Sequence, residues 1–353
     1  MKQESFNWRL FLMTVSLCVI FTLPSIVPFI SSWLWTLTSC LKMNDWANSS
    51  TSVVLDQSWT RAERSVLVAV LSVEMVLGVI GNGLVLLVKI MCRGRFPCRY
   101  WVPFVSLTLS DLGSSLLIIS GSLLAMLTKG QRSPWCEVVS LLKFAFITSS
   151  IGSIAILCVQ RTKGVATTGR GASVVVALAC LASWLTGVVF GSIPVVYNWI
   201  RYDPAEMLCA VFWESSYSDM LVYILCAFFI CILLPFLLIL FCSLFTTAGC
   251  ERNCDSDPDD LSSVTPLIVA FYLFCYTPFA VSELILLGKL DLSPAPDWLR
   301  TLSSVMSYLD CGLNPIIYCA NQDFREAGLA LFWTSRKLLF SEPVLTSMTK
   351  LEL

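Results

Sequence analysis

Seven long apolar stretches limit the folds open to this sequence more than any other feature. One of them, SVLVAVLSVEMVLGVIGNGLVLLV at residues 65–88, is close to the ~20 residues that cross a bilayer as a helix. Of the 353 residues, 56% are hydrophobic and only 13% are charged, whereas about a quarter of a soluble domain is charged. Because such a chain has too little polar surface to face water on all sides, we expect an integral membrane protein.

The stretches should be helices, since an open strand edge cannot satisfy its backbone groups in lipid. The sequence therefore predicts an all-α integral membrane protein, a seven-transmembrane helix bundle with short connections. The expected spans are residues 65–90, 102–127, 137–160, 173–197, 220–246, 264–288 and 299–320.

Composition excludes several classes of function. Histidine is absent, which removes the Ser-His-Asp and Cys-His nucleophiles and the His-based metal sites. The 16 cysteines lie mostly singly in apolar runs and lack paired zinc-like spacing, so no metal site is expected. A net charge of −1 without a basic patch argues against nucleic acid as a partner. We therefore expect a membrane protein that is not an enzyme.

Basic residues near the span ends predict the orientation of the chain. They are frequent after the first and third spans and in the C-terminal tail, which are expected in the cytoplasm. The sequon NSS at Asn48 predicts N-glycosylation on the opposite side. The basic residues are Lys89, Arg93, Arg95, Arg99, Arg161, Lys163, Arg170, Arg325, Arg336 and Lys337.

The chain divides into four regions. Residues 1–40 form a signal-peptide-like or signal-anchor segment, with Lys2 and Arg9 ahead of a long apolar run. It is either a cleaved signal or an uncleaved anchor that adds an eighth span. Residues 41–64 are the expected extracellular N-terminal region, 65–333 the membrane bundle, and 334–353 the cytoplasmic tail.

One polar or proline landmark recurs in each span, in a fixed order. The order resembles that of the rhodopsin-like (class A) G-protein-coupled receptors over about residues 65–333. The resemblance implies a cell-surface receptor that passes the binding of an extracellular ligand to heterotrimeric G proteins. It also implies arrestin as a further partner of the Ser- and Thr-containing tail. The landmarks are Asn82, Asp111, Cys136 with Arg161, Trp184 with Pro194, Pro235, Pro278, and NPIIY at 314–318.

The resemblance assigns structural roles to several of these residues. It implies a disulfide between Cys136 and Cys209, and a hydrogen bond between Asn314 and Asp111. Pro315 would bend the seventh helix, because it removes one backbone donor, and Tyr318 would face the cytoplasmic core. The segment NQDFREAGLALFW places its apolar residues on roughly one helical face, which is consistent with the family's short amphipathic helix after the seventh span.

Arg161 occupies the position of the family's coupling arginine. In the family, the acid before this arginine holds it at rest, but here that residue is Gln160. Asp259 and Asp260 stand near the foot of the sixth helix and are the expected replacements. We therefore expect raised basal activity or a non-standard form of coupling.

A polar core is expected midway along the bundle. Asn82, Asp111 and Ser150 match the family's sodium pocket, and Asp310 stands where the family has a small polar residue. The two carboxylates either hold a cation more tightly or share a proton. Sodium is the one ion expected in this core, and no other cofactor is expected.

Lys143 is the most informative residue for the ligand. It lies eighteen residues before Arg161, which is five full helical turns, so both share one helical face, and Ser150 lies close to it. Amine receptors of the family carry an Asp at the position of Lys143, and opsins carry the retinal-linking Lys at that of Tyr308, so neither ligand class is expected. The ammonium pairs either with an anionic ligand, such as a lipid acid or peptide, or with an internal acid, Glu283 or Glu74. The expected ligand-binding residues are Lys143, Ile147, Tyr276, Glu283, Ser304 and Tyr308.

Two alternatives to a signalling receptor remain open at this stage. The first is a receptor-like membrane protein that binds or scaffolds without activating G proteins, which Gln160, Ser243 and the acidic connection at 247–263 favour. The second is a transporter or membrane enzyme, against which the missing repeats count.

Overall fold

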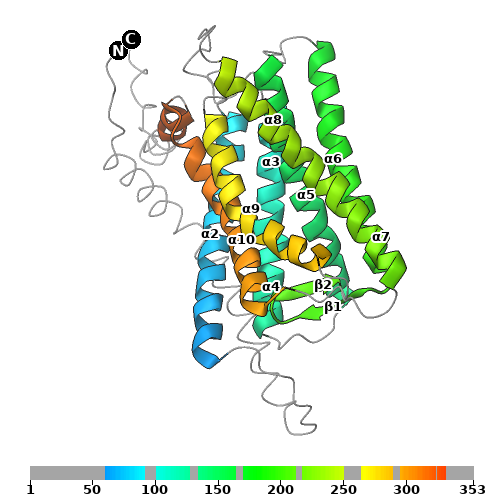
Figure 1. Cartoon of the computed structure of the whole chain (residues 1–353). Coiled ribbons are helices and arrows are strands. Elements are labelled where there is room, and N and C mark those ends of the chain that lie inside the picture. The colour runs from blue at the N-terminus through cyan, green and yellow to red at the C-terminus, as the bar shows by residue number, and fades with distance from the viewer. Residues whose placement is uncertain are drawn as a thin grey trace, which may run out of the picture.

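The computed structural model describes residues 60–91, 101–127, 134–163, 170–211, 217–249, 264–288, 295–322 and 324–330. In these residues, long helices stand side by side and a small β-hairpin lies at one end of the bundle (Figure 1). We call this end the hairpin end and the opposite end, which carries Arg161, the arginine end. The N-terminal segment, Asn48, Asp259, Asp260 and the tail 334–353 all lie outside the described residues.

The helices occupy all seven predicted spans within a few residues. Two of the spans are continuous helices interrupted by a π-helical segment, α3–η1–α4 and α7–η2–α8. The helices are α2 (Arg61–Met91), α3 (Trp101–Gly113), η1 (Ser114–Ile119), α4 (Ser120–Leu127), α5 (Pro134–Lys163), α6 (Arg170–Val196), α7 (Tyr217–Ala227), η2 (Phe228–Leu233), α8 (Leu234–Gly249), α9 (Thr265–Gly288) and α10 (Asp297–Tyr318).

Six of the seven spans are long and apolar enough to cross a membrane. The last helix, α10, has 22 residues but is less apolar, because it carries several serines together with Asp310 and Asn314. It packs chiefly against α9 and α2, and its serines, Asp310 and Asn314 are mostly buried. The seventh span is therefore a helix whose polar face is covered by protein rather than by lipid.

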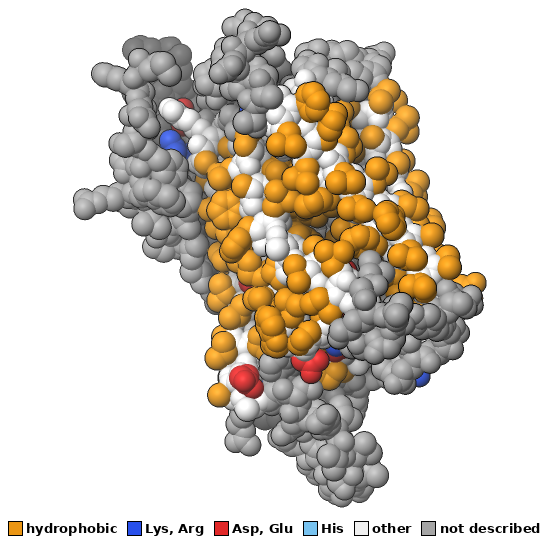
Figure 2. Space-filling model, viewed as in Figure 1, with side chains coloured by type: hydrophobic (Ala, Val, Ile, Leu, Met, Phe, Trp, Pro, Cys, Tyr) orange, Lys and Arg blue, Asp and Glu red, His pale blue; other side chains and the backbone are white. Residues whose placement is uncertain are grey.

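The outward faces of the helices suit a hydrocarbon environment. On α6, the exposed side chains Val174, Leu178, Leu181, Leu185 and Val189 recur every three to four residues, which places them along one face. Hydrophobic side chains cover most of the described part of the face shown in Figure 2, and acidic ones appear toward its lower edge. This distribution is expected of a membrane bundle and not of a water-soluble one.

Prolines and hydroxyls account for the local irregularities of two spans. Segment η2 ends two residues before Pro235, whose ring nitrogen cannot donate to the preceding turn. A π-helical turn is one way in which a helix absorbs that missing bond. In η1, the Ser115 hydroxyl donates to the Asp111 carbonyl at 2.7 Å, a back-bond that often accompanies helix distortion.

Small residues let neighbouring helices approach closely. A Cβ atom on Gly113 would lie 2.5 Å from the Phe146 ring of α5, and one on Gly187 would lie 2.7 Å from the Ala145 Cα. Both distances are shorter than van der Waals contact, so glycine sets the spacing of α3 and α6 against α5.

The hairpin consists of β1 (Ile200–Asp203) and β2 (Leu208–Val211), which pair antiparallel from Ile200 opposite Val211 to Asp203 opposite Leu208. The turn between them inserts Met207, which is fully buried, into an apolar cluster with Leu71 and Ile118 of the bundle. Met207 has a positive φ of 56°, which is uncommon for a residue other than glycine.

Candidate functional site

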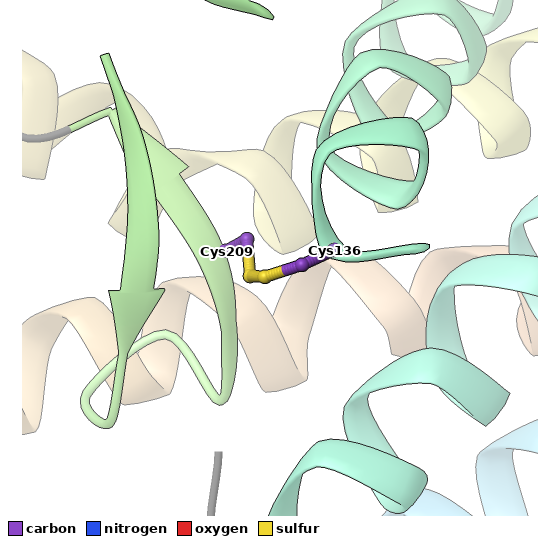
Figure 3. Close-up of a disulfide and its surroundings, with 2 residues drawn as sticks. All are labelled: Cys136 and Cys209. Carbon is purple, nitrogen blue, oxygen red and sulfur yellow. A yellow bond between two sulfur atoms is a disulfide. The ribbon is translucent and has the colours of Figure 1, made fainter. Parts of the chain in front are cut away.

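A disulfide fastens the hairpin to the helix that carries Lys143 and Arg161. Cys209 of β2 is bonded to Cys136 in the first turn of α5, with a Cα–Cα distance of 5.6 Å across 73 residues of sequence (Figure 3). This confirms the predicted pairing. The disulfide therefore fixes the hairpin to the hairpin end of α5, which is the end that carries Lys143.

Lys143 of α5 pairs with Glu206 in the hairpin turn. Its ammonium donates to the Glu206 carboxylate at 3.0 Å, and the two side chains are 14% and 26% exposed. Of the two alternatives for the Lys143 ammonium, the structure therefore shows an internal acid, but this acid is Glu206 and not Glu283 or Glu74; Glu283 lies within electrostatic range of Lys143. The hairpin turn supplies the acid because it descends onto the helix face that carries the lysine.

Arg300 in the first turns of α10 forms the second cationic centre at this end. It pairs with Asp203 of β1, lies 3.5 Å from Glu206 and lies 3.8 Å from Asp297. The next residue, Thr301, donates to the Ala205 carbonyl at 2.7 Å. Glu206 thus lies between two cations from different helices, and the hairpin joins α5 to α10.

The hairpin half-buries the Tyr202 side chain. Burial raises the pKa of the Tyr202 hydroxyl in β1, and the Arg64 guanidinium opposes this shift. Asp203, Glu206 and Arg300 were not predicted as site residues. Two acids a few residues before Cys209, which must lie near α5 once the disulfide forms, were the signal that could have found Glu206.

Of the remaining residues predicted to bind a ligand, Tyr308 lies near Lys143, whereas Tyr276 lies near the acidic residues midway along the bundle. Tyr308 of α10 is buried and its hydroxyl is 3.1 Å from that of Ser122, while Ser304, one turn away, is also buried. Ile147 is half-buried on α5. Tyr276 of α9 lies deeper, stacked on Tyr272 with ring centroids 4.4 Å apart.

The predicted polar core is present midway along the helices. The Asn314 amide of α10 donates to the Asp111 carboxylate of α3 at 2.8 Å, which confirms that predicted bond. The Asn82 amide of α2 donates to the backbone carbonyls of Gly78 and Cys311, at 2.9 and 2.8 Å. Asn82 therefore joins α2 to α10, and Asn314 joins α10 to α3.

Asp310 is the unusual member of this core. Its side chain is fully buried, and neither carboxylate oxygen has a hydrogen-bond partner within the described residues. The Ser150 hydroxyl of α5 is also buried without a partner there. Asp310 and Asp111 are close enough to interact electrostatically. This arrangement leaves oxygen ligands unused in the middle of the bundle.

A chain of hydroxyls next to this core was not predicted. Ser110 of α3 and Ser149 of α5 are 2.5 Å apart, and Ser153 donates to Ser106 at 2.8 Å. The Trp184 indole of α6 donates to the same Ser106 hydroxyl at 3.1 Å. These bonds join three helices, and the serine-rich runs SLTLSDLGSS and TSSIGS were their only sequence signal.

At the arginine end, Arg161 is half-buried near the last turn of α5. Gln160 before it is buried, and its amide atoms have no hydrogen-bond partner among the described residues. Tyr318 is fully buried, edge-on to Phe104 at 5.6 Å and to Phe324 at 6.2 Å. Phe324 lies in the helical residues 324–330, where the amphipathic helix was predicted.

Comparisons with known proteins agree with this geometry. A family profile described as "7 transmembrane receptor (rhodopsin family)" matches residues 81–318. Among curated proteins, the visual pigment-like receptor peropsin of Mus musculus is 23% identical over 318 residues, covering 84% of this chain and 93% of peropsin.

Two further matches come from different kinds of protein. The galanin receptor type 1 of Rattus norvegicus is 23% identical over 288 residues, covering 76% of this chain and 83% of that receptor. The crystal structure of squid rhodopsin superposes with a TM-score of 0.65 at 19% identity, covering 83% of this chain and 94% of that chain. The rhodopsin likeness supports the helical fold, and the profile match spans the core residues described above.

Proposed function

The chain belongs to the rhodopsin family of G-protein-coupled receptors, and from this premise we propose that it passes an extracellular signal to heterotrimeric G proteins through Arg161. The bond that carries this proposal is the one from Asn314 to Asp111. It joins α10 to α3 in a core with unused polar atoms, so a rearrangement there changes the packing of both helices. Tyr318, one turn after Asn314, extends the link to the arginine end.

The direct test of coupling is nucleotide exchange on purified G proteins in membranes that hold the receptor. We expect exchange without added ligand, because Gln160 supplies no charge to hold Arg161 at rest. The Arg161→Ala variant should reduce exchange to that of receptor-free membranes. A panel of G-protein classes is needed. Equal exchange by the wild type and the variant with every class would contradict coupling through Arg161.

Gln160 and Ser243 favour the second candidate function, a receptor-like protein that binds ligand without activating a G protein. Both replace residues that support coupling in the family, as the sequence resemblance implies. Ligand-dependent stabilisation of the purified protein without any nucleotide exchange would favour this candidate. In both cases, we place the chain among receptors rather than enzymes.

For the ligand, we propose a molecule with an acidic group that binds at Lys143. The Lys143 ammonium already donates to one carboxylate, that of Glu206, which supports this chemistry. The relatives' names include visual pigments, but Tyr308 stands where the resemblance places the retinal-linking lysine of opsins, which counts against light sensing through that bond. If Lys143→Ala leaves the response to an anionic agonist unchanged, this ligand class is wrong.

We further propose plasma-membrane localisation with the hairpin end outside and the C-terminal tail in the cytoplasm. The disulfide supports this orientation, because disulfides persist in oxidising compartments. Glycosylation at Asn48 and arrestin binding to the tail belong to the same proposal. Asn48→Gln checks the glycosylation proposal: the variant should lack the mass that a glycosidase removes from the wild type.

We separately propose that sodium binds in the polar core. The Asp310 and Ser150 oxygens, which have no hydrogen-bond partner among the described residues, support this.

A further inference from the structure

The turn of the hairpin, residues 204–207, joins two long helices of the bundle. Its Ala205 carbonyl accepts a hydrogen bond from Thr301 of α10 at 2.7 Å. Next along the turn, the Glu206 carboxylate lies 3.0 Å from the Lys143 ammonium of α5. Neighbouring turn residues thus contact different helices, so the turn ties α5 to α10 at the hairpin end.

The third contact of the turn is apolar. Met207 is fully buried and belongs to a cluster that includes Leu71 of α2 and Ile118 of η1. Its positive φ of 56° is uncommon for a residue other than glycine and carries a free-energy cost that its surroundings have to offset. Burial of the Met207 side chain supplies that compensation, and truncation of the side chain would leave a cavity between the turn and the bundle.

The turn is held in this shape from both sides. At its start, the Ala205 amide donates to the Asp203 carboxylate at 2.9 Å. Just beyond its end, Cys209 is bonded to Cys136 of α5. Because the turn is ordered and covalently tethered, its contacts form at a high effective concentration, and a diffusing molecule has to compete with them.

Helices α5 and α10 also meet near the arginine end. Leu157 of α5 and Tyr318 of α10 are buried there in one apolar cluster with Ile268 of α9. Cys158 and Cys242 belong to the same cluster, and each is 5% exposed. Because α5 and α10 each run unbroken from the hairpin end to this cluster, a shift between them at one end has to be accommodated by the packing at the other.

We propose that the hairpin turn is a built-in restraint that keeps the arginine end closed. The turn makes its contacts in the arrangement in which the cluster around Tyr318 is packed. A contact that exists in only one of two arrangements stabilises that arrangement by its own free energy. Loss of the turn contacts therefore raises the population in which the cluster is open. This concerns the regulation of the ligand site proposed above, and it rests on the proposed function for its consequence in signalling.

The ion pair of Glu206 is the contact that an acidic ligand releases. A ligand carboxylate at Lys143 takes the place of the Glu206 carboxylate. The displaced Glu206 still lies 3.5 Å from the Arg300 guanidinium, so it does not become an isolated buried charge. The exchange therefore avoids most of the penalty that breaking a buried ion pair normally carries.

Buried thiols report on the opening of the arginine end. The purified full-length receptor is treated with N-ethylmaleimide, and mass spectrometry follows the labelling of each cysteine over time. When a buried group opens and recloses faster than it reacts, its labelling rate follows the open population. Cys158 and Cys242 therefore measure opening at the arginine end. Cys231 of η2, which is 1% exposed, measures general loosening of the bundle.

The first variant removes the apolar contact. In Met207→Ala, we expect Cys158 and Cys242 to react about fivefold faster or more, because the truncated side chain no longer fills its place in the bundle. The rate at Cys231 should stay unchanged. Met207→Leu is the matched control, since it nearly conserves the volume of the side chain, and its labelling rates should stay close to those of the wild type.

The second variant removes the charge and keeps the shape of the turn, so it remains informative where Met207→Ala folds poorly. Glu206→Gln should speed the labelling of the two reporter cysteines by about threefold, as expected for the loss of one contact pair. Tyr223→Phe is its control. It removes a hydrogen bond of 3.1 Å to the Phe190 carbonyl between α6 and α7, outside the turn, and it should leave the rates unchanged.

Unchanged labelling of Cys158 and Cys242 in both Met207→Ala and Glu206→Gln would overturn the restraint, and so would an equal rise at Cys231. Nucleotide exchange by the same proteins separates this failure from a failure of the proposed function. Exchange by the wild type with unchanged labelling in the variants would leave coupling standing without the restraint. Faster labelling in the variants without exchange on any G-protein class would contradict coupling and leave the restraint standing.

Discussion

The hairpin end and the middle of the bundle treat buried charge in opposite ways. At the hairpin end, the carboxylates of Asp203 and Glu206 are paired with Lys143 and Arg300. In the middle, Asp111 accepts one hydrogen bond, from the Asn314 amide. Asp310 has no hydrogen-bond partner among the described residues. No ion pair found in the described part of the chain includes either core carboxylate.

This difference shows where a helix bundle can supply counter-charges. The hairpin is a connection, so it brings acids onto helix faces that already carry cations. Midway along the helices only neighbouring helices can contribute, and a cation placed there is costly if its partner leaves. The core carboxylates must therefore be neutralised by a proton or an ion, whereas Lys143 and Arg300 neutralise Asp203 and Glu206 at the hairpin end.

The largest effect should come from releasing the hairpin. In the chain-entropy description, a disulfide that closes 73 residues stabilises the fold by about 4 kcal/mol. The Cys136→Ser/Cys209→Ser variant should melt far below the wild type and reach the cell surface poorly. Thermal unfolding of the purified proteins measures this. An unchanged melting temperature would mean that the ion pairs hold the hairpin without the disulfide, so the disulfide would not be what places its acids on the helices.

The next effect concerns the core. Asn314→Ala leaves the Asp111 carboxylate without the amide that donates to it, at a cost of about 1–3 kcal/mol. Ser153→Ala is a suitable control, because it removes a hydroxyl bond of the same length between neutral groups. Chemical denaturation of both variants should show the larger loss for Asn314→Ala. Equal losses of stability would show that Asp111 is already neutral, because its hydrogen bond to the amide would then contribute no more than one between two serine hydroxyls.

A charge exchange at the hairpin end sharpens the contrast. Lys143→Glu and Glu206→Lys each place like charges together, and the double variant restores an ion pair. Residues in direct contact typically show a coupling energy of about 0.5–3 kcal/mol in such a cycle. We expect a value toward the lower part of this range because Arg300 also faces Glu206. Melting of the four proteins gives the coupling, and a value of zero would remove Lys143–Glu206 as a structural pair.

The sequence predicted the spans because a bilayer imposes a minimum apolar length, and each stretch meets it. The disulfide and the Asn314–Asp111 hydrogen bond were also predicted, because the landmark residues occur in the same order as in the receptor family. In both cases, the information lay in residues whose partners recur within a recognised pattern.

The hairpin network could not be predicted in the same way. The direct partner of Lys143 depends on how far a connecting turn descends into the bundle. That depth is set by the packing of Met207 and by the register of β1 on β2, and neither leaves a periodic signal in a four-residue strand. The serine chain between α3 and α5 was missed for a related reason, since single hydroxyls in helices usually bond to their own backbone.

The smallest effect tests what neutralises the core. In sodium-free buffer, Asp310→Asn should stabilise the receptor by about 1 kcal/mol, because it removes a buried carboxylate that has no donor in the described chain. With sodium, the wild type should gain stability as RT ln(1 + [Na⁺]/Kd), and the variant should gain less, since one ligand oxygen is gone. Melting in sodium, potassium and N-methylglucamine chlorides separates ion binding from ionic strength. Equal gains in all three salts would leave a shared proton as the neutralising charge, and the core would then differ from the hairpin end by protonation rather than by a bound ion.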